Sequence, residues 1–110
     1  GQACVAGSRL IVQRSVMDEL VARLQARLST VTPGPTWKAA TGYAPIISET
    51  QARRIDDILG RSRLQGAECL LGGGRIEGHG GAFYQPTLIA GVTAQTAAVR
   101  EEIFGPVLTI

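Results

Sequence analysis

Residues 48–71, SETQARRIDDILGRSRLQGAECLL, contain a helix signal followed directly by a strand signal. Ser48 can cap the helix, and Gln51 stands three residues later as a capping-box partner. One face of this helix is apolar at helical spacing: Ala52, Ile55, Ile58 and Leu59. Gly66 is expected to end the helix in a left-handed conformation, and 67–71 resemble a buried strand. A helix joined so closely to a strand is typical of α/β proteins.

Two further strand signals follow toward the C-terminus. GGGRIEGHGG, at 72–81, is a loop by composition. FYQPTLI, at 83–89, is strand-like, and Pro86 within it favours a sheet edge or the start of the strand. Residues 107–110 begin another strand. The alternation of strands with helices predicts a layered α/β structure.

Another helix is predicted over 16–28, with Ser15 as its cap. Its apolar stripe consists of Val16, Met17, Leu20, Val21, Leu24 and Leu28. SRLIVQ, at 8–13, suits a short buried strand of a parallel sheet. Residues 30–45 carry three prolines and no period, so we expect an extended surface loop pinned by Trp37 and Tyr43.

Composition narrows the class of protein. The 110 residues carry a net charge of +2, with eleven basic residues scattered among nine acidic ones, which argues against a nucleic-acid partner. The apolar runs are too short to span a membrane. The two cysteines are far apart in sequence, which disfavours a cysteine zinc site, and we expect reduced thiols in a cytoplasmic protein. No initiator methionine is present and the chain stops within a strand signal, so we expect both ends to be cut.

Cys4 lies in GQACVAGSR, at 1–9, among small residues. Such neighbours leave a sulfur accessible and let backbone N–H groups approach an atom bonded to it, as a nucleophile with an oxyanion hole requires. The alternative is a small buried hydrophobic residue, the usual place of cysteine in a globular chain. The surrounding residues leave both readings open.

GQACVAGSR resembles the active-site cysteine signature of the aldehyde dehydrogenase superfamily, in which a Gly-Gln pair precedes the nucleophile and Ala-Gly-Ser-Arg follows it. REEIFGPV, at 100–107, resembles the downstream motif of the same family and follows in the expected order. The elements between the two motifs also follow the course of the family. The resemblance therefore covers essentially the whole chain.

The resemblance implies a fold and an activity. Residues 1–110 would be part of a Rossmann-like catalytic domain of the aldehyde dehydrogenase fold, without the N-terminal NAD(P)-binding domain. The complete enzyme would oxidise an aldehyde to a carboxylic acid with NAD or NADP through a cysteine thioester, and it would form dimers or tetramers. In this family the asparagine of the oxyanion hole and the glutamate base precede the cysteine. We therefore expect this chain alone to be inactive.

The resemblance also implies roles for particular residues. Cys4 would be the catalytic nucleophile, with its own backbone N–H as one oxyanion donor. Glu102 and Phe104 would hold the ribose and the ring of the nicotinamide. Gln51 and Arg54 would approach the cofactor ribose from the second helix, with Arg54 in place of a common lysine.

Each role has a plainer alternative. Glu101 and Glu102 could be a solvated acidic pair, Phe104 a core aromatic residue, and Gln51 only a capping side chain. Two other kinds of function also stay open. One is a cysteine acyltransferase or hydrolase that works without nicotinamide, and the other is a non-catalytic α/β binding module.

Two residues with possible chemistry are expected to have no catalytic role. His79, the single histidine, has no partners that suggest a metal site or a triad, so we expect it to be solvated. Cys69 lies in an apolar strand signal and is expected to be inert packing. No metal site is predicted.

Overall fold

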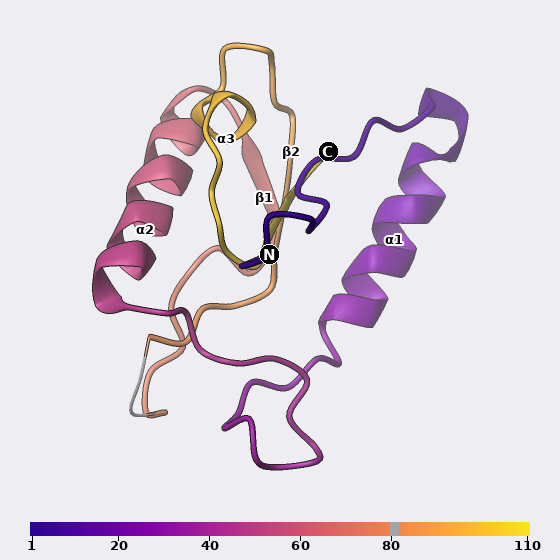
Figure 1. The fold of residues 1–110 in the computed structure, drawn as a ribbon. Helices are drawn as coiled ribbons and strands as arrows, with labels where there is room; N and C mark the ends of the chain where they lie inside the picture. Colours follow the sequence, from indigo (N-terminus) through magenta and orange to yellow (C-terminus); the bar gives the residue numbers. More distant parts are fainter. Residues whose placement is uncertain (80–81) are drawn as a thin grey trace.

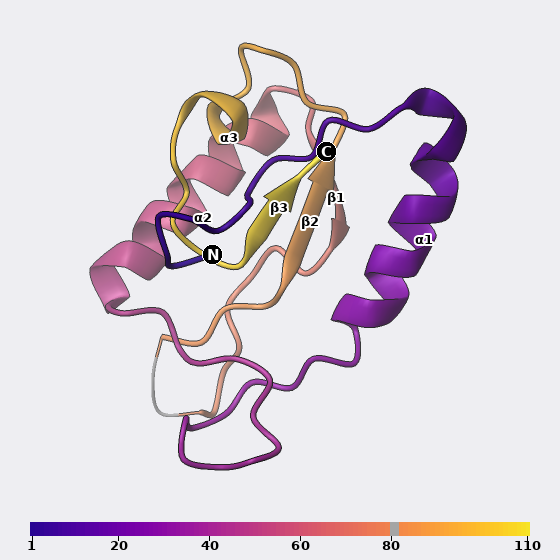
Figure 2. The same cartoon turned by 45° about the vertical axis from the view of Figure 1, so that its right-hand side comes forward.

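The computed structural model describes residues 1–79 and 82–110, so the last two residues of the predicted 72–81 loop lie outside the described part. The elements in chain order (Figure 1) are the 3-10 helix η1 (Arg14–Val16), α1 (Met17–Leu28), α2 (Glu49–Leu64), β1 (Glu68–Leu71), β2 (Thr87–Ala90), α3 (Ala97–Arg100) and β3 (Val107–Thr109). Figure 2 shows the sheet between α2 on one side and α1 on the other. The predicted α/β class is confirmed.

The sheet is mixed and has the strand order β1-β2-β3. β1 and β2 are antiparallel, with a register shift between Cys69 and Leu71. β2 and β3 are parallel, with Thr87 opposite Val107. The connection between these parallel strands contains α3, a four-residue helix that the sequence pattern did not predict because it is too short to show a period.

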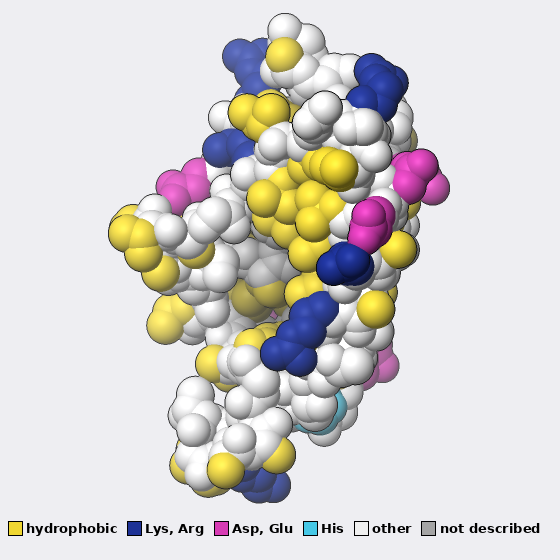
Figure 3. All heavy atoms as spheres, turned by 90° about the vertical axis from the view of Figure 1, so that its right-hand side faces the viewer, with side chains coloured by type: hydrophobic (Ala, Val, Ile, Leu, Met, Phe, Trp, Pro, Cys, Tyr) yellow, Lys and Arg dark blue, Asp and Glu magenta, His cyan; other side chains and the backbone are white. Residues whose placement is uncertain are grey.

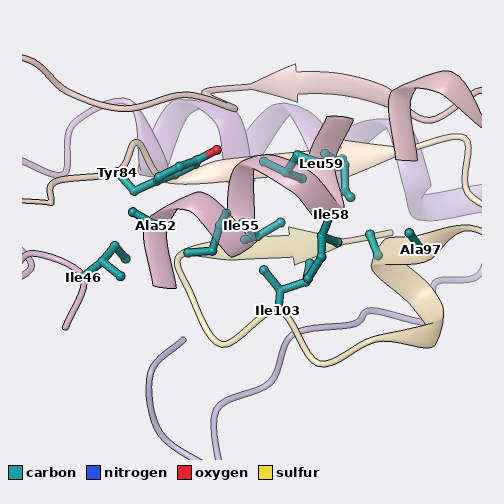
Figure 4. Close-up of a cluster of buried hydrophobic side chains, with 11 residues drawn as sticks. Ile46, Ala52, Ile55, Ile58, Leu59, Tyr84, Ala97 and Ile103 are labelled. Carbon is teal, nitrogen blue, oxygen red and sulfur yellow. The ribbon is translucent and has the colours of Figure 1, made fainter. Parts of the chain in front are cut away.

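The core lies between α2 and the sheet. The predicted apolar face of α2 is confirmed, since Ala52, Ile55, Ile58 and Leu59 are all at most 1% exposed. Figure 4 shows how side chains from other segments meet this face. The remaining members of the cluster are Ile46, Tyr84, Ile89, Ala97, Ala98, Ile103 and Val107. Burial of such side chains is the main stabilising contribution of the fold.

Both ends of α2 follow from local signals. Ser48 Oγ accepts a hydrogen bond from the Gln51 N–H at 3.1 Å, which confirms the predicted cap. The predicted reciprocal bond of the capping box, from the Gln51 side chain back to the cap, is absent, because the Gln51 side chain binds the carbonyls of Ile103 and Phe104 instead. Gly66 has φ +93°, which confirms the left-handed end of the helix.

The prediction of a strand over 8–13 is wrong. Arg9 forms a single parallel bridge with Thr109, and Ile11 is fully exposed. Thr109 accepts a hydrogen bond from the Leu10 N–H at 2.8 Å and donates its own N–H to Ser8 at 2.9 Å. Pairing stops there because β3 is only three residues long and the chain leaves its edge toward η1.

The predicted first helix starts one residue later than expected. Ser15 does not cap it; that residue lies in η1, and α1 begins after Val16 without a side-chain cap. No residue of α1 is fully buried, and the members of its apolar stripe from Met17 to Leu28 are half-buried. Figure 3 shows the side of the molecule on which α1 lies, with hydrophobic side chains gathered on it. Gln25 of α1 donates from Nε2 to the carbonyl of Leu70 at 2.8 Å and so joins α1 to β1.

Three predictions about the strands and loops need correction. β1 is only half-buried, because it is an edge strand with one neighbour. Pro86 directly precedes β2, which is the fully buried central strand. The prediction that Pro86 marks the start of a strand is therefore confirmed, and the alternative that it marks a sheet edge is wrong.

The loop 30–45 contains no helix or strand, as expected, but Trp37 is 83% exposed and cannot pin it. Tyr43 pairs with Pro33 across the loop, and burial raises the pKa of Tyr43.

Among the described residues, no helix has both the length and the apolar composition that crossing a membrane needs.

Candidate active site

Cys4 lies in a tight turn near the start of the chain. The turn, residues 3–6, is called the cysteine turn below; it is closed by a hydrogen bond of 2.9 Å from the Ala6 N–H to the Ala3 carbonyl. The Cys4 side chain is exposed. Its backbone N–H donates to none of the described residues, so it is available to an added acceptor. The thiol does not have the burial that the alternative, hydrophobic reading requires.

The segment before the cysteine turn is held from two directions. Gln2 donates from Nε2 to the Pro45 carbonyl at 3.2 Å and accepts the Ile47 N–H on Oε1 at 2.9 Å. Gly1 packs so closely on Gly105 that an added Cβ would collide with its carbonyl. The Gly-Gln pair therefore fixes the approach to the turn, and the glycine is required by a close backbone contact.

Residues 101–105, within the connection from α3 to β3, are called the acidic loop below. Within it, Phe104 has φ +53°, the only positive value among the non-glycine residues that the structure describes. Left-handed backbone costs roughly 1–2 kcal/mol for a residue with a Cβ, so surrounding contacts must hold it. Phe104 is half-buried and is not a member of the core cluster, which contradicts the reading of a core aromatic residue.

Two side chains of α2 bind the carbonyls of the acidic loop. Gln51 donates from Nε2 to Ile103 at 2.8 Å and to Phe104 at 3.1 Å. Arg54 donates from Nη1 to Glu102 at 2.6 Å and to Ile103 at 3.4 Å. The four residues assigned to the cofactor are thus brought together, but Gln51 and Arg54 contact the loop that presents the other two. The reading of Gln51 as only a capping side chain is wrong.

The two glutamates of the acidic loop have different surroundings. The Glu101 carboxylate binds the Arg61 guanidinium through two hydrogen bonds of 2.6 and 3.1 Å. The hydrogen bond with Arg61 lowers the pKa of Glu101, and the charges of Arg61, Arg54 and Arg100 lower it further. Glu102 is exposed, and its carboxylate makes no hydrogen bond or ion pair with the described residues. Of the two glutamates, Glu102 is therefore the one whose carboxylate is available to bind a further molecule.

Sequence reasoning missed the role of two arginines. Arg61 on α2 orders Glu101, and Arg9, which follows the cysteine turn, donates from Nη2 to the Glu101 carbonyl at 2.9 Å. Arg9 is the last residue of the Ala-Gly-Ser-Arg run that follows Cys4, and its place in this motif could have marked it as a site residue. Arg61 had no sequence signal, because its partner lies forty residues away.

The remaining candidates do not join this site. His79 is exposed and packs its ring near Phe83, with 5.4 Å between the ring centroids. Cys69 is half-buried in β1 and directs its Sγ toward the Leu71 carbonyl at 3.3 Å. Cys4 and Cys69 are both unpaired. Within 1–79 and 82–110, no group of three or more His, Cys, Asp or Glu side chains is placed to hold a metal ion.

The sequence and the fold of this chain both match known proteins. Residues 1–110 match the family described as Aldehyde dehydrogenase family. A solved structure of betaine aldehyde dehydrogenase from Staphylococcus aureus in complex with NAD+ superposes with a TM-score of 0.94 and 33% identity, over 98% of this chain and 22% of that one. The chain belongs to the aldehyde dehydrogenase family, as the sequence motifs predict, and its structure is part of that fold.

Curated relatives match over the full chain. Mitochondrial aldehyde dehydrogenase 2 of Saccharomyces cerevisiae is 37% identical over 110 residues, which are 100% of this chain and 22% of the relative. Succinate-semialdehyde dehydrogenase [NADP(+)] of Deinococcus radiodurans is 40% identical, again over 100% of this chain and 23% of the relative. The chain thus spans less than a quarter of the length of these relatives.

Proposed function

We propose that the complete protein is an NAD(P)-dependent aldehyde dehydrogenase that oxidises an aldehyde to a carboxylic acid. One observation carries the proposal: the exposed Cys4 thiol and the acidic loop with Glu102 and Phe104 belong to segments that are bonded to each other. Family membership supports the same reaction. The names of the relatives include betaine aldehyde and succinate semialdehyde as substrates, which supports an aldehyde as the substrate class.

The domain organisation is part of the proposal. Residues 1–110 form part of the catalytic domain, and a separate N-terminal domain binds most of the dinucleotide. The short share of each relative that this chain covers supports this arrangement. The chain alone is then inactive, and the complete enzyme is a dimer or tetramer. The two unpaired cysteines support a reducing compartment such as the cytoplasm.

The acidic loop fits a nicotinamide cofactor. Glu102 is an exposed acceptor without a partner among the described residues, and such a carboxylate suits the donor hydroxyls of a ribose. Phe104 offers a half-exposed ring on a backbone that Gln51 fixes. Both NAD and NADP carry this ribose and nicotinamide. Gln51 and Arg54 contribute to the cofactor site by holding the loop.

Cys4 performs the covalent chemistry in this proposal. Its thiolate attacks the carbonyl carbon of the aldehyde, a C–S bond forms, and the carbonyl electron pair moves onto oxygen. The Cys4 N–H donates to that oxyanion, and an oxyanion-hole donor of this kind typically stabilises the transition state by about 3–4 kcal/mol. The bound NAD(P) supplies the acceptor for the hydride that leaves the carbonyl carbon. Cys4 then carries a thioester, which water hydrolyses to the carboxylic acid and the free thiol.

The test compares the full-length protein with its Cys4→Ala variant, with NADH or NADPH formation followed over a panel of aldehydes. We expect the variant to lose more than about a thousandfold of the turnover, because the nucleophile is removed while the fold is retained. Cys69→Ala is the matched control and keeps the wild-type turnover. Undiminished turnover in Cys4→Ala would refute the proposal. Wild-type activity that saturating NAD(P) leaves unchanged, with no NADH or NADPH formed, would favour a hydrolase or acyltransferase, and no turnover together with slow alkylation of Cys4 would favour a binding module.

A further inference from the structure

Four successive carbonyls of the acidic loop are bound by side chains from only three residues. Arg9 binds the carbonyl of residue 101, Arg54 those of 102 and 103, and Gln51 those of 103 and 104. Two of the three donors are guanidinium groups, and hydrogen bonds from charged donors are stronger than neutral ones. Irregular backbone with a left-handed residue needs such partners to keep a single conformation.

Arg9 differs from the other two donors in where it comes from. Gln51 and Arg54 extend from α2, whereas Arg9 extends from the segment that carries the cysteine turn. Its neighbours Ser8 and Leu10 both pair with Thr109 of β3, so the backbone on either side of Arg9 is fixed to the sheet. The Arg9 guanidinium therefore binds the acidic loop from a backbone segment that the sheet holds in place, and this segment lies a few residues after Cys4.

We propose that Arg9 is a positioning residue, which holds the acidic loop in a fixed place beside the cysteine turn so that Glu102 and Phe104 are presented to the cofactor. This inference rests on the proposed function, because it assigns Glu102 and Phe104 to the cofactor. Arg9 acts through the backbone of residue 101 and does not touch the cofactor. Without Arg9, the loop keeps its contacts to Gln51, Arg54 and Arg61 of α2 but loses its direct hydrogen bond to the segment that carries Cys4.

The experiment measures the Kd for NAD+ and NADP+ and the steady-state constants of the full-length protein with Arg9→Met, which keeps the aliphatic stem and removes the donor. We expect the Kd and the KM for the cofactor to rise about tenfold, with kcat changed less, as loss of a charge-assisted hydrogen bond predicts. Arg9→Lys keeps a charged donor and recovers part of the affinity. Arg53→Met is the matched control, because that exposed arginine on α2 binds only Glu49 among the described residues, and its Kd stays at the wild-type value.

A double-mutant cycle with Glu102→Gln separates positioning from general stability. If Arg9 acts by presenting Glu102, the loss of affinity in the double variant is smaller than the two single losses combined. A merely structural role would lower the melting temperature and leave the Kd of the folded variant unchanged, which would overturn the inference. If Arg9→Met does not fold, Arg9→Leu, which also lacks a donor, replaces it with the same expectation and the same contradicting result.

The outcomes distinguish this inference from the function on which it rests. Wild-type NAD(P)-dependent turnover that requires Cys4, together with an unchanged Kd in Arg9→Met, overturns the role of Arg9 alone. A wild-type protein that binds neither NAD+ nor NADP+ overturns both. A raised Kd, partial recovery with lysine and a non-additive cycle support both.

Discussion

Gly105, in the acidic loop, packs directly against the core. A Cβ added there would collide with the Ile55 side chain, which is fully buried and has little room to move. The sequence motif predicted Glu102 and Phe104 as site residues, but nothing in it revealed the left-handed backbone of Phe104. That conformation depends on contacts with α2, which are distant in sequence, so local patterns could not predict it.

Gly105→Ala is therefore expected to destabilise the protein by about 1–3 kcal/mol, because overpacking a filled core displaces its neighbours. Thermal unfolding of the full-length protein measures the effect as a lower melting temperature. Gly60→Ala is the matched control. Nothing lies near an added Cβ at that helical position, and replacing glycine inside a helix stabilises by about 0.5–1 kcal/mol. An unchanged or higher melting temperature in Gly105→Ala would contradict the packing described here.

At the scale of elements, α2 was the most predictable part of the fold because its signals are local. The cap, the apolar period and the left-handed glycine lie within one segment. The segment 8–13 has strand composition but forms only one bridge, since a strand requires a partner and β3 is too short to supply a longer one. Ser15 failed as a cap because a 3-10 turn precedes α1 and takes up that residue.

The two serines give a direct comparison of a real cap with an apparent one. Ser48→Ala removes the side chain that accepts the Gln51 N–H and should cost about 1 kcal/mol of stability. Ser15→Ala removes no capping bond and should stay within about 0.5 kcal/mol of the wild type. Both effects are measured as shifts of the melting temperature. Equal shifts of the melting temperature in the two variants would contradict the start of α1 at Met17 without a cap from Ser15.

The Glu101–Arg61 pair joins the acidic loop to α2 and makes stability depend on pH. The hydrogen bond from Arg61 to the Glu101 carboxylate places the folded-state pKa of Glu101 below the ordinary value of 4.5. A carboxylate with a lowered folded-state pKa stabilises the fold above the unfolded-state pKa, and this contribution is lost as the pH falls through the folded-state pKa. We expect Glu101→Gln to lower the melting temperature at pH 6, with the gap to the wild type narrowing below about pH 4.5.

Glu68→Gln is the control for this titration. Glu68 is exposed and makes no ion pair with the described residues, so Glu68→Gln should leave the melting temperature at pH 6 unchanged. A gap between Glu101→Gln and the wild type that stays constant from pH 6 to 3 would show that the pair does not titrate in this range.

At the scale of the whole molecule, the candidate site joins the two ends of the described chain. The order of the two motifs predicted the family and the candidate residues, and family membership is confirmed over residues 1–110. Spacing alone could not show that the segments are in contact. That follows from the close packing of Gly1 on Gly105 and from the bond between Arg9 and residue 101.

Covalent chemistry at Cys4 is the central step of the proposed reaction, and trapping the adduct tests it directly. The full-length protein is mixed with an aldehyde and NAD+ or NADP+, quenched with acid during the first turnover, and its peptides are weighed by mass spectrometry. We predict that the peptide with Cys4 gains the mass of the aldehyde less two hydrogen atoms, as a thioester requires. Formation of NADH or NADPH while Cys4 stays unmodified, or an adduct on another residue, would contradict the account.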